Sequence, residues 1–255
     1  MIHVGTSGFS YADWIGSAYP EGTAKRDMLP LYSRLFDTVE IDATYYAVPG
    51  RKTLASWIER TPRDFSFSVK AHKSLTHERE NPDFSGFQKA VMPLFEAGKL
   101  GCVLLQFPYS FHRGPENLSY LRTMSEALRP LPQIAEFRSV DWVEDETFDL
   151  LRELGVGYCC VDEPHLRGLM PPVVVATSDT AYVRFHGRNA AQWWEHKEAA
   201  QRYDYSYSEA ELREWVPRVG QLSRESETVY VYFNNHVRGQ AVQNAQLFLS
   251  LISEG

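Results

Sequence analysis

The stretch Thr180–Arg188, TAYVRFHGR, contains residue types that bind anions and transfer protons. Side chains alternate across a β-strand, so Arg184 and His186 would point to one face, and Val183 and Phe185 to the other. A strand covered by helices on both sides needs apolar residues on both faces. An arginine and a histidine on one face therefore indicate a functional site or a fully paired polar core.

Each of the other strand-like runs has two alternate rows of side chains. If the more apolar row packs against the covering helices, the other row faces inward and ends in a polar side chain. The remaining, inward rows then end in Ser7, Glu40 with Asp42, Ser68 with Lys70, Gln106, Glu136 with Arg138, Asp162, and Asn234. In parallel strands such ends meet at one rim, where barrel enzymes carry their active sites. The alternative is a purely structural ion-pair network, because a buried charge without a partner costs several kcal/mol.

Polar and charged side chains gathered at one rim favour acid–base chemistry on a small anionic molecule. As general base we expect Glu40 or Glu136, and as general acid His186 or Lys70. Lys70 could instead form a Schiff base, or simply pair with a carboxylate. The residues expected to bind the substrate are Arg138, Arg184, Arg188, Gln106, Asn234, Asn235, Tyr11, Trp14 and His77.

Aromatic residues are concentrated in two loops that would open on the same rim. The loop Gly8–Pro20 contains Tyr11 and Trp14, and the loop Asn189–Tyr207 contains two tryptophans and three tyrosines. Aromatic planes beside cations suit a flat or sugar-like ligand with an anionic part. The alternative is that these rings only pack the loops onto the fold.

Eight strand-like runs, most of them followed by a helix-like run, must position these residues. The expected strands are Ile2–Ser7, Thr38–Asp42, Phe65–Lys70, Gly101–Phe107, Gln133–Arg138, Gly157–Asp162, Thr180–Gly187 and Thr228–Asn234. The expected helices are Lys25–Phe36, Thr53–Thr61, Asp83–Ala97, Pro115–Leu128, Glu144–Leu154, Ser208–Leu222 and Gly239–Leu251. After the sixth strand, Glu163–Val173 is an irregular Pro-rich connection. The pattern predicts a single α/β domain, a (β/α)₈ TIM-type barrel over residues 1–255. An open doubly wound sheet is less favoured, because no Gly-x-Gly-x-x-Gly turn follows the first strand.

Composition narrows the classes of partner. Hydrophobic residues make up 44% and charged residues 23% of the 255 residues, as is ordinary for a globular protein. A net charge of −7 argues against a broad basic surface for nucleic acid. The chain enters its first strand without a signal-peptide pattern and has no membrane-length apolar run, so we expect a cytoplasmic protein. The three cysteines, two of them adjacent, suit a reducing compartment.

Seven segments occur in an order that points to a known family: GTSGFSYADW, VEIDATYY, FSFSVKAHKSLTHE, LLQFPYSF, EFRSVDW, YVRFHGR and YVYFNN. Together they resemble the YecE-like family, domain of unknown function 72. The resemblance implies a TIM-barrel fold and no established reaction. It also implies a site whose recurring polar residues correspond here to Glu40, Lys70, His77, Gln106, Glu136, Arg138, Arg184, His186, Asn234 and Asn235. The chain departs from the family at Ser139, where a histidine is frequent. A suggested relationship of such proteins to abasic-site endonucleases is an analogy only.

Two other functions remain open at this stage. Metal-dependent phosphodiester hydrolysis on nucleic acid would use Glu40, Glu136, Asp162, His77 and His186 as ligands of a divalent metal. Inward-facing lysine and arginine residues would compete for those carboxylates, so we expect no cofactor and do not favour nucleic acid. A non-catalytic ligand-binding barrel would use the same residues as an enzyme. The sequence makes no prediction of oligomeric state.

Overall fold

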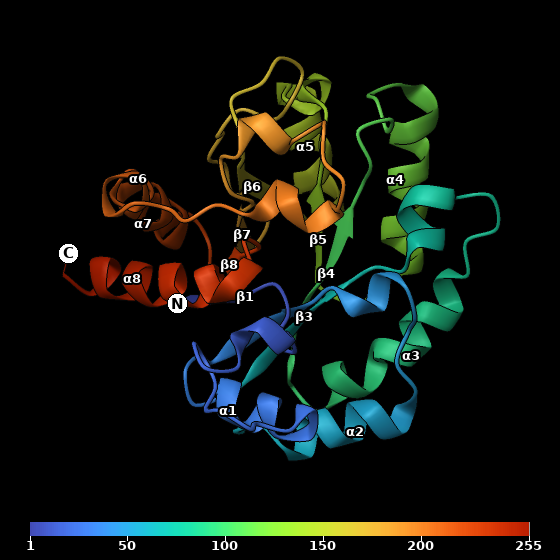
Figure 1. Ribbon diagram of the computed structural model, residues 1–255. Coiled ribbons are helices and arrows are strands. Elements are labelled where there is room, and N and C mark those ends of the chain that lie inside the picture. Colours follow the sequence, from blue (N-terminus) through green and yellow to red (C-terminus); the bar gives the residue numbers. More distant parts are fainter. Residues whose placement is uncertain (255) are drawn as a thin grey trace.

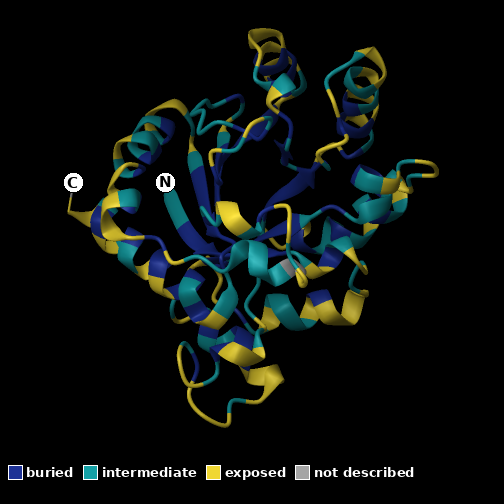
Figure 2. Cartoon of the chain, turned by 45° about the horizontal axis from the view of Figure 1, so that its top comes forward, coloured by how far each residue is buried: buried dark blue, intermediate teal, exposed yellow. Residues whose placement is uncertain are grey.

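Eight parallel strands form one sheet in the order β1-β8-β7-β6-β5-β4-β3-β2 (Figure 1). The computed structural model describes residues 1–254, apart from the side chain of Ala199. The strands are β1 Ile2–Thr6, β2 Thr38–Ile41, β3 Ser66–Lys70, β4 Leu100–Gln106, β5 Gln133–Glu136, β6 Val156–Asp162, β7 Thr180–Phe185 and β8 Thr228–Phe233. They curve into a nearly closed barrel with buried strands at its centre and exposed residues on the outer helices (Figure 2). The predicted (β/α)₈ barrel is confirmed.

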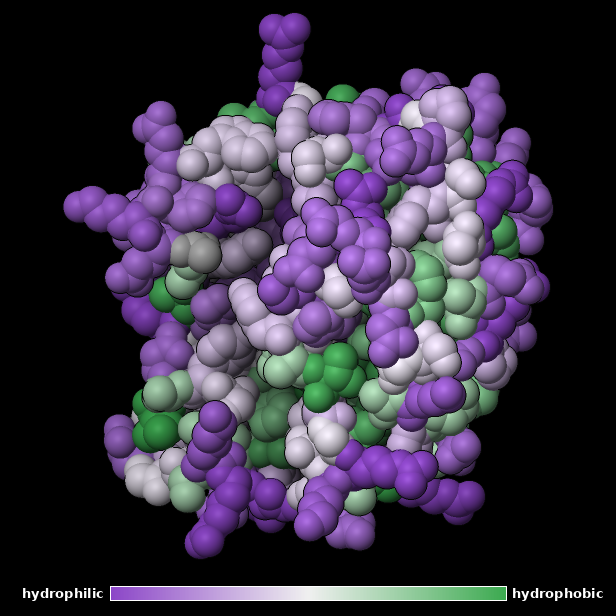
Figure 3. Space-filling model, turned by 90° about the vertical axis from the view of Figure 1, so that its right-hand side faces the viewer, coloured by the Kyte–Doolittle hydropathy of each residue, from purple (hydrophilic) through white to green (hydrophobic). Residues whose placement is uncertain are grey.

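Helices alternate with the strands around the barrel. They are α1 Met28–Tyr32, α2 Arg51–Glu59, α3 Phe84–Glu96, α4 Pro115–Ala127, α5 Asp145–Leu154, α6 Glu209–Arg213, α7 Val216–Glu225 and α8 Gln240–Ser253. Hydrophilic residues cover most of the face formed by α3 and α4, and apolar side chains gather in its lower half (Figure 3). Within residues 1–254, no helix has the length and apolar character needed to cross a membrane.

Two helices are shorter than predicted. The run 25–36 contains a 3₁₀ turn and only five residues of α-helix, α1. The run 208–222 is divided into α6 and α7, with Pro217 in the first turn of α7. Proline has no N–H to donate to the carbonyl four residues earlier, so the first helix stops and a second begins. The connection from Glu163 to Asp179 contains no helix or strand, so the predicted irregular segment Glu163–Val173 is confirmed.

The barrel closes between β1 and β2 through few direct contacts. The backbone N–H of Gly8 donates to the Glu40 carbonyl at 2.7 Å. The Tyr32 hydroxyl fills the gap lower down, because it accepts from the Thr6 N–H at 2.9 Å and donates to the Thr38 carbonyl at 3.1 Å. This seam holds Glu40 at the edge of the barrel interior.

The predicted inward rows are correct except in β6. There, Val161 is in register with Arg184, and Asp162 with Phe185, so Asp162 points into the helical layer. The prediction that Asp162 faces inward is wrong. The more apolar row of this strand, with Cys159 and Val161, faces the interior, because the Asp162 carboxylate has its own partners outside the barrel.

Candidate active site at the barrel mouth

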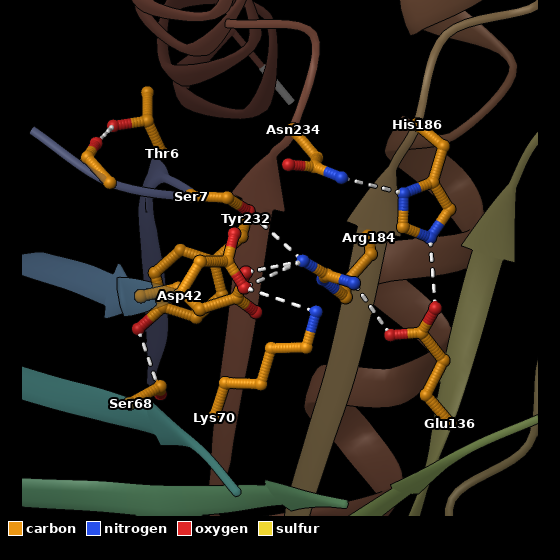
Figure 4. Close-up of polar contacts among 12 residues, drawn as sticks. Thr6, Ser7, Asp42, Ser68, Lys70, Glu136, Arg184, His186, Tyr232 and Asn234 are labelled. Atoms are coloured by element: carbon orange, nitrogen blue, oxygen red, sulfur yellow. Dashed lines mark hydrogen bonds and ion pairs between the residues drawn. The ribbon is translucent and has the colours of Figure 1, made fainter. Parts of the chain in front are cut away.

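Arg184 of β7 joins Glu40 and Glu136 across the barrel interior, and Figure 4 shows its contact with Glu136. Its Nη2 lies 2.5 Å from Glu40 Oε1, and its Nη1 lies 2.7 Å from Glu136 Oε2. The other Glu40 oxygen accepts from the Tyr182 hydroxyl at 2.6 Å. All four side chains are buried. Residues from β2, β5 and β7 therefore converge on one point, as the alternation predicted.

The two glutamates that share Arg184 differ in pKa. Burial raises the pKa of Glu40, and the Asp42 carboxylate adds to the rise while Arg184 opposes it. Burial also acts to raise the pKa of Glu136, but Arg138 and Arg184 outweigh it and hold this pKa well below its usual range. Glu136 is thus ionised, and Glu40 is the first of the pair to take up a proton as the pH falls.

Both ring nitrogens of His186 have hydrogen-bond partners, and one of them is Glu136. Its Nε2 is 3.1 Å from Glu136 Oε1, and its Nδ1 is 3.1 Å from the Asn234 amide nitrogen (Figure 4). The tautomer that satisfies both contacts has its proton on Nε2, donates to Glu136 and accepts from Asn234. Burial, followed by the charge of Arg138, lowers the pKa of His186 to about 3. His186 is therefore a neutral group that orients Glu136.

Lys70 and Asp42 form the layer above, where the site meets solvent. Lys70 Nζ lies 3.6 Å from Asp42 Oδ1, and the two side chains are 15% and 26% exposed. The same oxygen is 3.6 Å from Arg184 Nη2, yet it is buried and has no hydrogen-bond partner among residues 1–254. The Lys70 ammonium also lies 4.9 Å from the centre of the Tyr45 ring. Asp42 thus offers an unused acceptor between two cations. Its signal in the sequence was its place two residues after Glu40.

Arg138 is the second cation with access to the mouth, and its side chain is 10% exposed. Its guanidinium lies 2.8 Å from Glu136 Oε1 and 3.2 Å from Glu163 Oε2. Glu163 also accepts the Met170 backbone N–H at 3.0 Å. Burial raises the pKa of Glu163 to about 7, and Arg138 opposes the rise. Glu163 was not predicted, because it follows β6 in a connection without a periodic pattern.

Three predicted polar residues border this layer. The ring of His77 packs edge-on against Tyr45, with the centroids 4.8 Å apart. Burial, with the charges of Lys70 and Arg138, lowers the pKa of His77 to about 4. The Gln106 amide donates to the Phe107 carbonyl at 2.7 Å. Gln106 and Asn234 remain only 8% and 7% exposed.

The predicted aromatic residues have different surroundings. The Tyr11 hydroxyl donates to the Ser7 carbonyl at 2.8 Å, and its partly exposed ring stacks on His236 with centroids 4.6 Å apart. Trp14 is fully buried, and its Nε1 donates to the His236 carbonyl at 2.7 Å. Tyr203, from the loop after β7, lies with its ring centroid 6.2 Å from that of His186. Tyr11 and Tyr203 can therefore face a ligand, whereas Trp14 anchors its loop.

Arg188 does not join the mouth. Its guanidinium lies 2.9 and 2.7 Å from the two oxygens of Asp162, 3.4 Å from Glu211 and 3.0 Å from Glu214. Asp162 also accepts the Trp215 indole N–H at 2.7 Å. These groups form a separate cluster in the helical layer around α6 and α7. Three carboxylates already engage the guanidinium, so the predicted anion-binding role of Arg188 is not retained in the function proposed below.

Asn235 and Ser139 contact neighbouring loops and helix α8. The Asn235 amide donates at 2.8 Å to both the Tyr205 carbonyl and the Asn244 side chain of α8. It fixes the loop after β7 to the helical layer. Ser139 Oγ, where a histidine is frequent in the family, lies 3.2 Å from His112 Nδ1.

The metal-ligand set of the nuclease hypothesis does not assemble in residues 1–254, where no group of three or more His, Cys, Asp or Glu side chains is arranged to hold an ion. Glu40 and Glu136 are already bound by guanidinium groups. Asp162 lies outside the barrel, and both nitrogens of His186 are in contacts. Metal analysis of the purified protein tests this alternative directly, since a stoichiometric divalent metal would favour it.

A family model described as "Protein of unknown function DUF72" matches residues 3–255 of the chain. The UPF0759 protein YunF of Bacillus subtilis is 33% identical over an alignment 270 positions long, which covers 99% of this chain and 95% of YunF. The UPF0759 protein YecE of Escherichia coli K12 is 30% identical over 125 residues, 48% of this chain and 42% of YecE.

Solved structures match over the whole barrel. The crystal structure of a DUF72 family protein from Thermotoga maritima superposes with a TM-score of 0.92 at 41% identity and covers 99% of both chains. A DUF72 family protein from Enterococcus faecalis superposes with a TM-score of 0.88 at 27% identity, covering 99% of this chain and 96% of the other. The predicted family resemblance is confirmed.

Proposed function

The chain belongs to the DUF72 family, and we propose that its barrel is an enzyme that performs acid–base chemistry on a small anionic substrate, sugar-like or nucleotide-like. The observation that carries the proposal is the pair of Lys70 and Asp42, 3.6 Å apart and partly exposed above a buried ionic floor. An acid and a base beside one another at the mouth are the minimum requirement for moving a proton on and off a substrate.

Asp42 is the proposed general base and Lys70 the proposed general acid. Buried polar atoms in proteins almost always have hydrogen-bond partners, so the unpartnered Oδ1 of Asp42 calls for an explanation. Oδ1 has the charges of Lys70 and Arg184 at 3.6 Å in place of hydrogen bonds, and the exposed part of the Asp42 side chain is where a substrate hydroxyl or C–H would give up its proton. The Lys70 ammonium then faces the negative charge that develops on the substrate and can return a proton to it.

Arg138 and Lys70 are the proposed anion-binding pair. Glu136 and Glu163 contact the Arg138 guanidinium on the protein side, which fixes its orientation before a ligand arrives. The lowered pKa of His77 supports a positive local field here, because Lys70 and Arg138 both contribute to it. Lys70 and Arg138 are thus the groups at the mouth that would receive a carboxylate or phosphate.

The buried floor consists of Glu40, Glu136, Arg184 and His186. Glu40, Glu136 and His186 are fully buried, so we assign them to positioning instead of the direct acid–base roles expected from the sequence. Through Arg184 and Arg138, they fix the charges that hold Asp42 and the anion site in place. Asn234 and Gln106 remain the proposed partners of substrate hydroxyls.

The proposal is tested by incubating the protein with a panel of phosphorylated and carboxylated sugars and nucleotides and following product formation by NMR. We expect conversion of at least one compound, and a rate lower by about 100-fold in both Asp42→Asn and Lys70→Met. Lys89→Met, which changes an exposed lysine elsewhere, should keep the parent rate. Undiminished turnover in both mouth variants would refute the assignment. Binding without turnover by the parent would favour the non-catalytic barrel.

A further inference from the structure

A groove with a volume of about 940 Å³ lies beside the mouth. It runs between the chain that follows β1 and the chain that follows β2, and helix α2 forms one wall. This volume is in the range of pockets that hold nucleotide-sized ligands. Of the charged residues that the structure describes at the mouth, only Asp42 also lines the groove.

Asp42 and Tyr11 connect the groove to the proposed active site, because both line its inner end. Asp42 is the proposed base, and its Oδ1 lies 3.6 Å from Lys70 Nζ. A substrate that reacts at Asp42 can therefore extend into the groove without leaving the site. The inference below rests on the proposed function in this respect.

The floor of the groove is apolar. Phe9, Leu29 and Trp57 line it, and Trp57 is supported from below by Phe67, with nearly parallel rings 5.8 Å apart. Trp57 itself is only partly buried. A rigid aromatic floor of this kind favours a flat group such as a nucleobase.

Four cations line the groove, against one carboxylate, that of Asp42. Arg26 and Arg60 lie 3.7 and 3.8 Å from Asp27, which offsets part of their charge. The other two cations, Lys25 and Lys52, are exposed and have no ion-pair partner within 4 Å among residues 1–254. A cationic rim in a chain of net charge −7 matches a phosphate group.

We propose that the groove binds a nucleoside phosphate arm of the substrate. The base packs on Phe9 and Trp57, the phosphate lies at Lys25 and Lys52, and the group that reacts reaches Asp42. The substrate class narrows accordingly, from anionic small molecules in general to nucleotide-linked compounds. An aliphatic chain or a second copy of the protein would use the floor but not the cations.

The test is calorimetric titration of the protein with ADP, adenosine and octanoate at low salt. ADP should bind more tightly than adenosine and octanoate. The double variant Lys25→Gln, Lys52→Gln should weaken ADP binding about tenfold, since each exposed contact to a phosphate contributes modestly. The matched control Lys89→Gln, Lys197→Gln removes two exposed lysines elsewhere and should change ADP affinity less than about twofold.

The inference is overturned if ADP fails to bind at millimolar concentration, if both double variants weaken it equally, or if octanoate binds more tightly than ADP. Dimerisation that masks Trp57 would also overturn it. Asp42→Asn should keep ADP binding while losing turnover, which separates the two proposals. Loss of ADP binding with turnover of another anion intact would refute the groove alone.

Discussion

The guanidinium of Arg184 lies 2.7 Å from the carboxylate of Glu136, a contact that joins β7 to β5 through the barrel interior, past the intervening strand β6. The same guanidinium holds Glu40 of β2. One arginine thus compensates two buried carboxylates from strands far apart in the sheet. The site depends on Arg184, because Asp42 lies 3.6 Å from its guanidinium and also 3.6 Å from Lys70.

Replacing Arg184 with methionine should lower the free energy of unfolding by about 3–5 kcal/mol, because Glu40 and Glu136 lose a shared buried partner. Urea denaturation measures the change. The matched control is Arg122→Met, which breaks the exposed Arg122–Glu153 pair and should cost less than about 1 kcal/mol. Equal losses in the two variants would contradict the paired interior.

His186 and His77 should contribute less stability as the pH drops from about 6.5 toward 3, because burial lowers the pKa of His186 to about 3 and that of His77 to about 4. The raised pKa values of Glu40 and Glu163 act in the opposite direction, so the quantity to measure is the difference in pH dependence between the parent and a His186 variant. Between the unfolded and folded pKa values of the two histidines the unfolded chain binds more protons, so their stabilisation is lost in acid and is complete only above about 6.5. His186→Gln should flatten this dependence. The exposed control His165→Gln should leave it unchanged. If the free energy of unfolding changes with pH in the same way in the parent and in His186→Gln, His186 is not held neutral.

Removing the Lys70 charge should raise the pKa of His77, because the ammonium is one of the groups that lower it. The variant is Lys70→Met, and the pKa is read from the NMR shifts of the His77 ring carbons over a pH series. Lys89→Met provides the control for loss of one positive charge elsewhere. An unchanged His77 pKa in Lys70→Met would contradict the placement of the Lys70 ammonium near His77 at the mouth.

Asp162→Asn should destabilise the protein without affecting ligand binding at the mouth. The carboxylate accepts the Trp215 N–H and two Arg188 contacts, so neutralising it should cost about 1–3 kcal/mol. Affinity for an anion at the mouth should stay within about twofold of the parent. A large loss of affinity with little loss of stability would place Asp162 in the binding site after all.

Much of the fold follows from period-two alternation and the order of the runs. Arg184, Glu40 and Glu136 were predicted to converge because closure of a parallel sheet leaves one place for polar inward residues. Alternation failed at Asp162, because the rule assumes that only apolar rows face helices. Its partner Trp215 lies 53 residues further along the chain, so no local pattern could reveal that the carboxylate is satisfied outside the barrel.

The candidate site was harder to predict than the barrel. The sequence gives residue types at the mouth but not their depth, so it predicts the same acid role for His186 and Lys70. Only the structure separates the buried imidazole from the partly exposed ammonium. Glu163 had no signal, because an irregular connection has no period from which a direction can be read. Arg188 comes soon after β7, which predicted a place at the mouth. Its side chain is instead directed by Glu211 and Glu214 in the α6–α7 region.

The central claim is that the mouth of the barrel is an anion site built by Lys70 and Arg138 beside Asp42. The most direct test is a crystal structure of the protein soaked in selenate, with the selenium located by its anomalous signal. A selenate with oxygens within about 3.5 Å of both Lys70 Nζ and the Arg138 guanidinium is the predicted result. Selenate bound only at the groove cations or at Arg188, with none at Lys70 and Arg138, would contradict the account.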